Sequence, residues 1–176
     1  FGVAINQLMF FKGLSLTTPI NASIIMTINP AVVVVGAYLA GSERLTLKKI
    51  GGLLLGATGA YLLITKDGAD FNNEHFLGNL FVFINACSYA AYLVVVKPLM
   101  ARYQSLTVIK WVFLFGGLIA VPFGIPELFA VHWTALPPIA WLSVSYVVIG
   151  TTFLAYLLNA WGLKFVNSSV VGIYIY

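Results

Sequence analysis

The sequence predicts an all-α fold, a polytopic bundle of transmembrane helices, from three observations. Of the 176 residues, 61% are hydrophobic and only 8% are charged, whereas soluble domains carry about 25% charged residues. The mean hydropathy is +0.99. The apolar residues also form runs of about 16 to 23 residues, close to the ~20 that an α-helix needs to cross a bilayer.

Five whole spans and two partial ones are expected, joined by short polar links. The partial spans stand at the two ends of the sequence, which both look cut through a helix, so we expect a piece of a longer protein. In chain order the expected spans cover residues 3–14, 20–39, 47–64, 79–96, 108–123, 139–161 and 169–176. Residues 124–138 contain Pro126, Pro137 and Pro138, which a single helix does not accommodate.

The span over residues 20–39 is expected to be one uncharged helix of about 30 Å, with Asn29 and Pro30 at its middle. A proline inside a helix frees backbone groups that must find partners where water is absent. We therefore expect this helix to lie inside the bundle, beside a polar or hydrated feature, and to bend at Pro30.

The next span, residues 47–64, carries Gly52, Gly56 and Gly59 on one helical face. Small residues at this spacing let helix backbones approach each other closely. Packing within the bundle is the favoured interpretation, and a homodimer face is the alternative.

The distribution of basic residues predicts the orientation. One set of alternate links, with the adjoining helix ends, holds seven Lys and Arg against one acid, Glu43, and the other set holds two Lys against four acids. The seven are Arg44, Lys48, Lys49, Lys97, Arg102, Lys110 and Lys164. Because cytoplasmic links carry the excess of Lys and Arg, the first set is expected in the cytoplasm and the acidic link 65–77 on the periplasmic or extracellular side. We expect a multi-pass protein of the bacterial inner (plasma) membrane.

An internal repeat appears at an offset of 149 residues, which lays residues 8–14 on residues 157–163. Both copies show a helix with polar and aromatic residues, a Gly-Leu pair or its equivalent, a short polar link and an apolar helix start. The copies lie five helices apart, an odd number, so they would cross the membrane in opposite directions. Inverted repeats are frequent in secondary transporters, whose binding site lies near the midplane between the halves.

Two longer runs carry a family resemblance. Residues 13–63 resemble the second half of an EamA domain: a Gly-Leu link, a helix start of small residues, a mid-helix proline, an exit in Glu-Arg-Leu-Thr and a Gly-rich next helix. These features fall at Gly13-Leu14, Asn21-Ala22-Ser23, Pro30, Glu43-Arg44-Leu45-Thr46 and Gly52/Gly56/Gly59. Residues 78–116, with Gly78, Tyr89, Tyr92, Lys97 and Leu106-Thr107 in register, are similar to the start of a second EamA domain.

The resemblance is to the EamA family of the drug/metabolite transporter (DMT) superfamily, and it implies ten helices in two inverted five-helix halves. Residues 1–64 would end the first repeat, with a partial helix 3 and helices 4 and 5. Residues 65–77 would be the external linker, and residues 78–176 would begin the second repeat, with helices 6 to 8 and a partial helix 9. Asn29 departs from the family pattern at a position where members vary, so we expect it to bear on the substrate.

The middles of the spans contain no Asp, Glu, His or Arg. This pattern argues against a proton relay of buried carboxylates, against carriers that hold phosphates with buried cations, and against an enzyme with an acid–base pair; no metal site, cofactor or nucleic-acid partner is expected. The remaining groups are amides, hydroxyls and aromatic rings. The candidate residues of a substrate pathway are Asn6, Gln7, Asn29, Asn85, Tyr89, Tyr92, Trp111, Tyr146, Thr152, Tyr156 and Asn159.

Each of these residues also has a structural interpretation: amides can join helices, threonines can bond their own helix backbone, and Trp111 suits the membrane interface. A pocket of neutral groups fits a small neutral, zwitterionic or amphipathic solute. We expect a secondary transporter, an exporter of an amino acid-like solute that works by alternating access, with an unknown coupling ion. The alternative is a non-transporting membrane receptor or assembly subunit.

Overall fold

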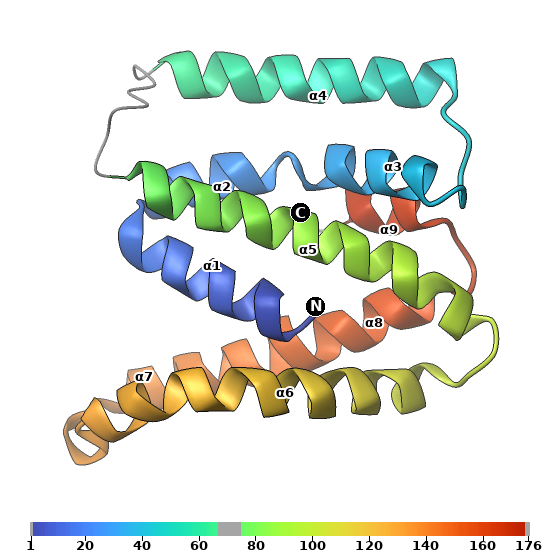
Figure 1. Cartoon of the computed structure of the whole chain (residues 1–176). Helices are drawn as coiled ribbons and strands as arrows, with labels where there is room; N and C mark the ends of the chain where they lie inside the picture. The colour runs from blue at the N-terminus through green and yellow to red at the C-terminus, as the bar shows by residue number, and fades with distance from the viewer. Residues whose placement is uncertain (1, 67–74, 175–176) are drawn as a thin grey trace.

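The structure, a computed structural model, describes residues 2–66 and 75–174, and the described part is all helical (Figure 1). The helices run roughly side by side, with α5 in the middle of the bundle, α4 on one flank and α6 on the other. Their bounds are α1 (Ala4–Leu16), α2 (Pro19–Met26), α3 (Asn29–Leu39), α4 (Leu47–Lys66), α5 (Phe76–Met100), α6 (Ser105–Ala130), the 3-10 turn η1 (Trp133–Ala135), α7 (Pro138–Ser145), the π-helix η2 (Tyr146–Leu154), α8 (Ala155–Gly162) and α9 (Ser168–Ile173).

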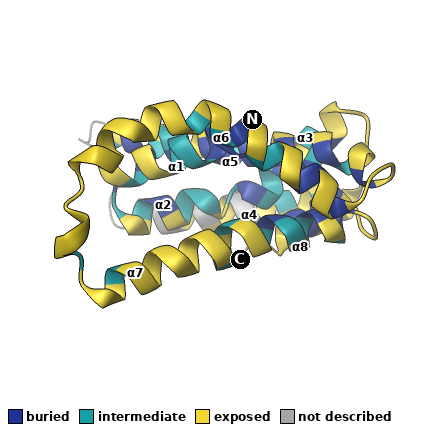
Figure 2. Cartoon of the chain, turned by 90° about the horizontal axis from the view of Figure 1, so that it is seen from below, coloured by how far each residue is buried: buried dark blue, intermediate teal, exposed yellow. Residues whose placement is uncertain are grey.

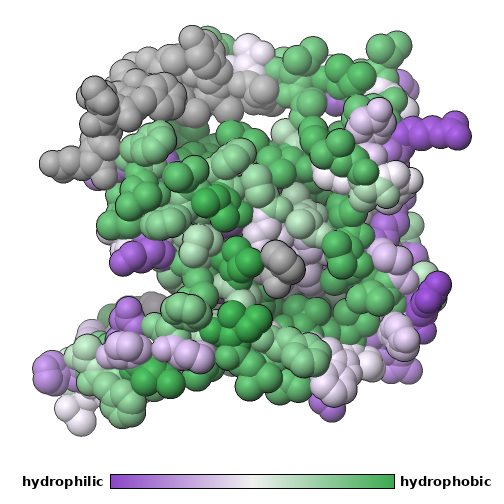
Figure 3. Space-filling model, viewed as in Figure 1, coloured by the Kyte–Doolittle hydropathy of each residue, from purple (hydrophilic) through white to green (hydrophobic). Residues whose placement is uncertain are grey.

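Four described segments are long and apolar enough to cross a membrane: Pro19–Leu39, Phe76–Met100, Ser105–Ala130 and Pro138–Gly162. The expected fifth whole span corresponds to α4, a helix of 20 residues with Lys48 and Lys49 in its first turn. Hydrophobic side chains cover the middle of the molecule and hydrophilic ones gather toward its two ends (Figure 3), as expected for a protein whose exposed faces meet lipid.

The core forms around α5, whose buried face meets α1, α3, α8 and α9, and Figure 2 shows the buried residues gathered at the centre. The helices α1 and α5 approach each other closely at Gly78, where an added Cβ would lie only 2.6 Å from the carbonyl carbon of Leu16. Thr17 and Asn79 bond beside this contact, Oγ1 to Oδ1 at 2.6 Å. The glycine therefore sets how closely α1 packs on α5.

The segment expected to be one helix over residues 20–39 is two helices, so that expectation is wrong in detail. The helix α2 ends at Met26 and α3 begins at Asn29, directly before Pro30. The Ile28 amide donates to the Ile25 carbonyl at 3.0 Å, a tight i to i+3 bond. Because Pro30 has no N–H, the regular ladder is interrupted at its position, and the chain winds tightly for two residues before the second helix starts.

Two other helices differ from expectation. The helix α6 does not stop at residue 123 but continues through Pro122 and Pro126 to Ala130, because each proline removes only one hydrogen bond from a long apolar helix. The segment Pro138–Gly162 contains nine residues of π-helix, which hydropathy does not predict. The expected link 65–77 lies mostly outside the described residues.

Candidate functional site

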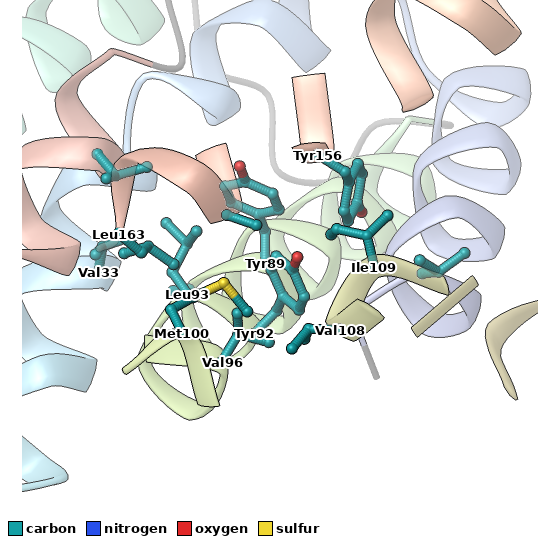
Figure 4. Close-up of a cluster of buried hydrophobic side chains, with 14 residues drawn as sticks. Val33, Tyr89, Tyr92, Leu93, Val96, Met100, Val108, Ile109, Tyr156 and Leu163 are labelled. Carbon is teal, nitrogen blue, oxygen red and sulfur yellow. The ribbon is translucent and has the colours of Figure 1, made fainter. Parts of the chain in front are cut away.

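Three tyrosines meet at the centre of the bundle. Tyr89 and Tyr92 lie at the middle of α5, and Tyr156 reaches them from α8 (Figure 4). The Tyr156 ring centroid lies 5.3 Å from that of Tyr92 and 6.1 Å from that of Tyr89, the latter pair being perpendicular. Phe113 of α6 contacts Tyr156 from another side, at 5.5 Å. Such tilted and edge-on pairs are the favoured geometry for aromatic rings.

Amide side chains bond two of these tyrosines. The Asn159 amide donates to the Tyr89 hydroxyl at 2.7 Å. The Tyr156 hydroxyl lies 2.9 Å from Oδ1 of Asn6 and also within bonding distance of the Gly2 carbonyl. We call Asn6, Tyr89, Tyr92, Tyr156 and Asn159 the tyrosine–amide cluster. It joins the start of α1 to α5 and α8 through neutral polar groups.

Asn6 and Asn85 also join α1 to α5 by a reciprocal pair of bonds. The Asn85 amide donates to the Asn6 carbonyl at 2.7 Å, and the Asn6 amide donates to the Asn85 carbonyl at 3.4 Å. The Gln7 side chain also interacts with the Tyr156 hydroxyl. The structure thus brings seven of the eleven candidate residues together, and gives Asn6 and Asn85 a clear role in holding two helices.

Two buried oxygens of this region have no hydrogen-bond partner among the described residues, namely Oδ1 of Asn85 and the hydroxyl of Tyr92. An unsatisfied buried polar group costs about 1–3 kcal/mol. These two atoms are therefore available to a bound solute or water. Tyr92 also lines an apolar groove of about 760 Å³ between α5 and α6.

Trp111 belongs to this groove and not to the cluster. It lies on α6, is 49% exposed and stacks on Phe115 with ring centroids 5.6 Å apart. Gly2 and Val3, at the start of α1, close the groove where it meets Tyr92. The lining is otherwise mostly aliphatic.

Asn29 is fully buried at the break between α2 and α3. Its amide lies 3.6 Å from the Met26 sulfur, a weak acceptor, and its Oδ1 has no partner among the described residues. Within the part of the chain that the structure describes, Asn29 shares no hydrogen bond with the tyrosine–amide cluster, so it forms a separate buried polar position beside Pro30.

The remaining candidates lie elsewhere. Tyr146 and Thr152 are on η2, in which no residue is buried, so neither reaches the cluster. An added Cβ at Gly52 or Gly59 would meet nothing within 4 Å, and the surroundings of Gly56 lie outside the part of α4 whose side chains are described. Among the described residues, no three His, Cys, Asp or Glu side chains come together as metal ligands.

Sequence reasoning missed a buried carboxylate at one end of the bundle. Glu43 lies in the link between α3 and α4, and its side chain is 3% exposed. Lys49 of α4 donates to its Oε2 at 2.6 Å, and Ser169 of α9 donates to it through both its amide and its hydroxyl. The available signal was the Glu-Arg-Leu-Thr exit, whose glutamate is the one acid among seven basic residues.

Glu43 is ionised at neutral pH. Desolvation by burial raises the pKa of its carboxyl, but the hydrogen bonds from Lys49 and Ser169 and the charge of Lys49 outweigh burial and hold this pKa below its ordinary value of 4.5. A buried carboxylate that accepts three hydrogen bonds of this kind is anchored in place.

Comparison with known proteins identifies the family. A model of the EamA-like transporter family matches residues 1–65 and 76–176. The chain is 25% identical to an uncharacterized transporter of Archaeoglobus fulgidus over 99% of its own length and 60% of the relative's. It is 22% identical to the uncharacterized transporter YyaM of Bacillus subtilis (94% and 55%) and 27% identical to the uncharacterized inner membrane transporter YicL of Salmonella typhimurium (88% and 51%). No solved structure matches it.

The chain therefore spans between about half and three-fifths of the length of these curated relatives. The family model covers nearly all of it, with only the region of the link before α5 unmatched. Together with the apolar helices and the uncharged centre, this match confirms the predicted family: the chain belongs to the EamA-like transporter family, multi-pass integral membrane proteins that are transporters and not enzymes.

Proposed function

We propose that the chain forms part of a secondary transporter that moves a small neutral, zwitterionic or amphipathic solute, such as an amino acid-like metabolite, out of the cell by alternating access. The observation that carries this proposal is the tyrosine–amide cluster. It lies at the centre of the bundle, where α1, α5 and α8 meet, and its hydroxyl and amide groups carry no charge. Membership of the EamA-like transporter family favours a transporter over the alternative, a non-transporting receptor or assembly subunit.

The chemistry of the cluster supports this class of solute. Hydroxyls and amides both donate and accept hydrogen bonds, so they suit a solute with an amine and a carbonyl or carboxyl group but no net charge. Aromatic rings supply flat apolar walls. The unpartnered oxygens of Asn85 and Tyr92 would gain partners when such a solute binds. Asn29 is proposed to contribute a further amide, with Pro30 allowing the broken helix to bend.

We further propose that residues 1–64 and 78–176 belong to two inverted halves of a ten-helix protein. The structure supports the offset of 149 residues, because α2 begins at Pro19 and α9 begins at Ser168, at that separation. The residues preceding these helices each meet one end of α5: Thr17 bonds Asn79, and Asn167 accepts from Lys97 at 2.6 Å. A homodimer through the glycine face of α4 remains a proposal of the sequence alone.

Efflux from vesicles tests the function. Vesicles that carry the protein are loaded with a mixed panel of amino acids and other small neutral or charged metabolites, and the solutes that leave are identified by mass spectrometry. One neutral or zwitterionic class should leave faster than from empty vesicles. Tyr156→Phe and Asn159→Ala should slow that efflux, while Tyr38→Phe, at an exposed tyrosine of α3, should not. Unchanged fluxes across the whole panel, or export of phosphorylated solutes alone, would refute the proposal.

A further inference from the structure

A tight turn after α3 fixes the direction in which Glu43 points. Gly41 adopts a left-handed conformation with φ of +67°. The Ala37 carbonyl, in the last turn of α3, accepts from the amides of Ser42 and Glu43 at 3.0 and 3.2 Å and from the Ser42 hydroxyl at 2.9 Å. A left-handed glycine that closes a helix in this way is a common helix stop. The backbone of Glu43 is therefore held on the end of α3, and its side chain is directed away from solvent.

The Glu43 carboxylate connects three parts of the chain that are far apart in sequence. Its Oε1 accepts from the Ser169 amide at 3.1 Å, and its Oε2 accepts from the Ser169 hydroxyl at 2.5 Å and from Lys49 at 2.6 Å. Hydrogen bonds to an ionised group are about twice as strong as neutral ones. We call Glu43, Lys49 and Ser169 the carboxylate latch. It ties the start of α9 to the α3–α4 link and to α4.

The start of α9 is also tied to α5 on its other side. The Ser168 hydroxyl, in a residue with no exposed surface, donates to the Leu93 carbonyl at 3.3 Å. Lys97 donates to the Asn167 side chain. The link between α3 and α4 and the start of α9 lie at the same end of the bundle in Figure 1, the end that the basic residues predict to be cytoplasmic. At the other end no residue of α7 or η2 is buried.

We propose that Glu43 is a gating residue: the carboxylate latch closes the cytoplasmic side of the transporter in this conformation, and its release frees α9 when the two halves move. The proposal rests on the proposed function of alternating access. It gives the Glu-Arg-Leu-Thr exit a role that spacing along the sequence does not reveal, since Glu43 and Ser169 are 126 residues apart.

The latch suits a gate because its strength depends on the exclusion of water. An ionised carboxylate that is buried must be paired, and removing its partners is costly while it stays dry. Opening the cytoplasmic side would hydrate both the carboxylate and Lys49, so water would replace the lost bonds. The latch bonds therefore stabilise the closed conformation without making the open conformation inaccessible.

Cysteine accessibility tests the proposal without a known solute. In a Cys87→Ala background, Ser168→Cys places a near-isosteric thiol at a site with no exposed surface, and Ala22→Cys places one at a buried site on α2, toward the opposite end. A membrane-impermeant maleimide is applied to inside-out and right-side-out vesicles. Glu43→Gln should raise the labelling of Ser168→Cys from the cytoplasmic side by about tenfold or more, and should leave Ala22→Cys no more reactive.

Two further variants keep the test sharp. Ser169→Ala should raise labelling by less than Glu43→Gln, because the backbone amide of residue 169 still bonds the carboxylate, and it should add little in the Glu43→Gln background. Glu127→Gln, at an exposed glutamate of α6, is the matched control and should leave the labelling of both cysteine reporters unchanged. If Glu43→Gln does not fold, Ser169→Ala carries the test.

Labelling that rises at both reporters would show general loosening, and labelling that rises at neither would show that Glu43 does not close this side; either result overturns the proposal. The readout is independent of any transported solute. A failure of the efflux experiment would therefore contradict the proposed function, whereas the labelling experiment alone decides whether Glu43 closes the cytoplasmic side.

Discussion

Replacing Gly78 by alanine tests the contact that positions α1 on α5. The new Cβ would lie 2.6 Å from the Leu16 carbonyl carbon and 2.7 Å from the Thr17 amide nitrogen, and both are backbone atoms that no rotamer change can move. To restore an ordinary contact of 3.4 Å the two helices must separate by roughly 0.8 Å. That movement strains the bond of Thr17 to Asn79 and the contact of His75 with the Leu16 carbonyl at 3.2 Å.

The magnitude follows from these terms. Overpacking a tight interface costs about 1–3 kcal/mol, and each of the two strained bonds contributes about 1 kcal/mol. Alanine returns about 1 kcal/mol through its higher helix propensity. The net loss is about 2–4 kcal/mol, which lowers the melting temperature of a protein of this size by about 5–15 °C. The assay is thermal unfolding in detergent at a fixed heating rate, followed by size-exclusion chromatography.

Gly52→Ala is the matched control, because its Cβ would meet nothing within 4 Å. It removes the same kind of residue from a helix without a steric clash, so its melting temperature should equal that of the parent or rise slightly. A Gly78→Ala protein that melts within about 2 °C of the parent would refute the reasoning, since even the lowest net cost predicts about twice that shift.

Two other predictions use the polar groups. Tyr156→Phe leaves Oδ1 of Asn6 without its hydroxyl partner and should lower the melting temperature by a few degrees, a loss of about 1–3 kcal/mol, while Tyr38→Phe should not; equal effects would show that the buried hydroxyl is unimportant. The latch should not respond to physiological pH. Because the pKa of Glu43 is lowered on folding, its stabilisation is present above the ordinary value of 4.5 and is lost only as pH falls through the lower folded-state pKa. The cation that pairs with the Glu43 carboxylate is Lys49. The nearby Lys97 on α5 bonds the Asn167 side chain and not Glu43. The maleimide reacts with the thiolate, whose fraction falls with pH, so labelling of Ser168→Cys is divided by that of a fully exposed cysteine at the same pH. This ratio should stay flat from pH 8 to pH 5, and a rise in it near pH 6.5 would contradict the prediction.

The sequence predicts the spans and part of the cluster because both depend on local pattern. Hydropathy finds the membrane helices, since each must be apolar over its length. Tyr89 and Tyr92 are three residues apart, so one helical face presents both.

The rest depends on contacts that local pattern does not encode. The charge of Glu43 indicates a solvated link, and only the packing of α9 against α3 buries it beside Ser169. Pro30 predicts a bend but not two residues of tight turn ahead of it, and no residue type in 146–154 marks a π-helix. The place of Trp111 outside the cluster follows from the loose packing of α6 on α5, which leaves the groove between them.

Under the proposed gate, the cluster and the latch have different tasks: the cluster selects the solute and the latch controls opening of the cytoplasmic side. A rotation of the two halves by about 15°, the size of known subunit rotations, displaces atoms about 15 Å from the midplane of a ~30 Å hydrocarbon core by about 4 Å. The latch lies at helix ends, between the end of α3 and the starts of α4 and α9. Hydrogen bonds near the ends of membrane helices do not survive that displacement, whereas bonds within about 3 Å of the midplane stretch by less than about 1 Å. The latch should therefore set how often the cytoplasmic side opens, and the cluster should set what is bound there. Glu43→Gln is then expected to change the rate of efflux for every transported solute by the same factor, measured as competition between two solutes in one vesicle preparation. An altered ratio between the two would place Glu43 in solute selection and contradict this division.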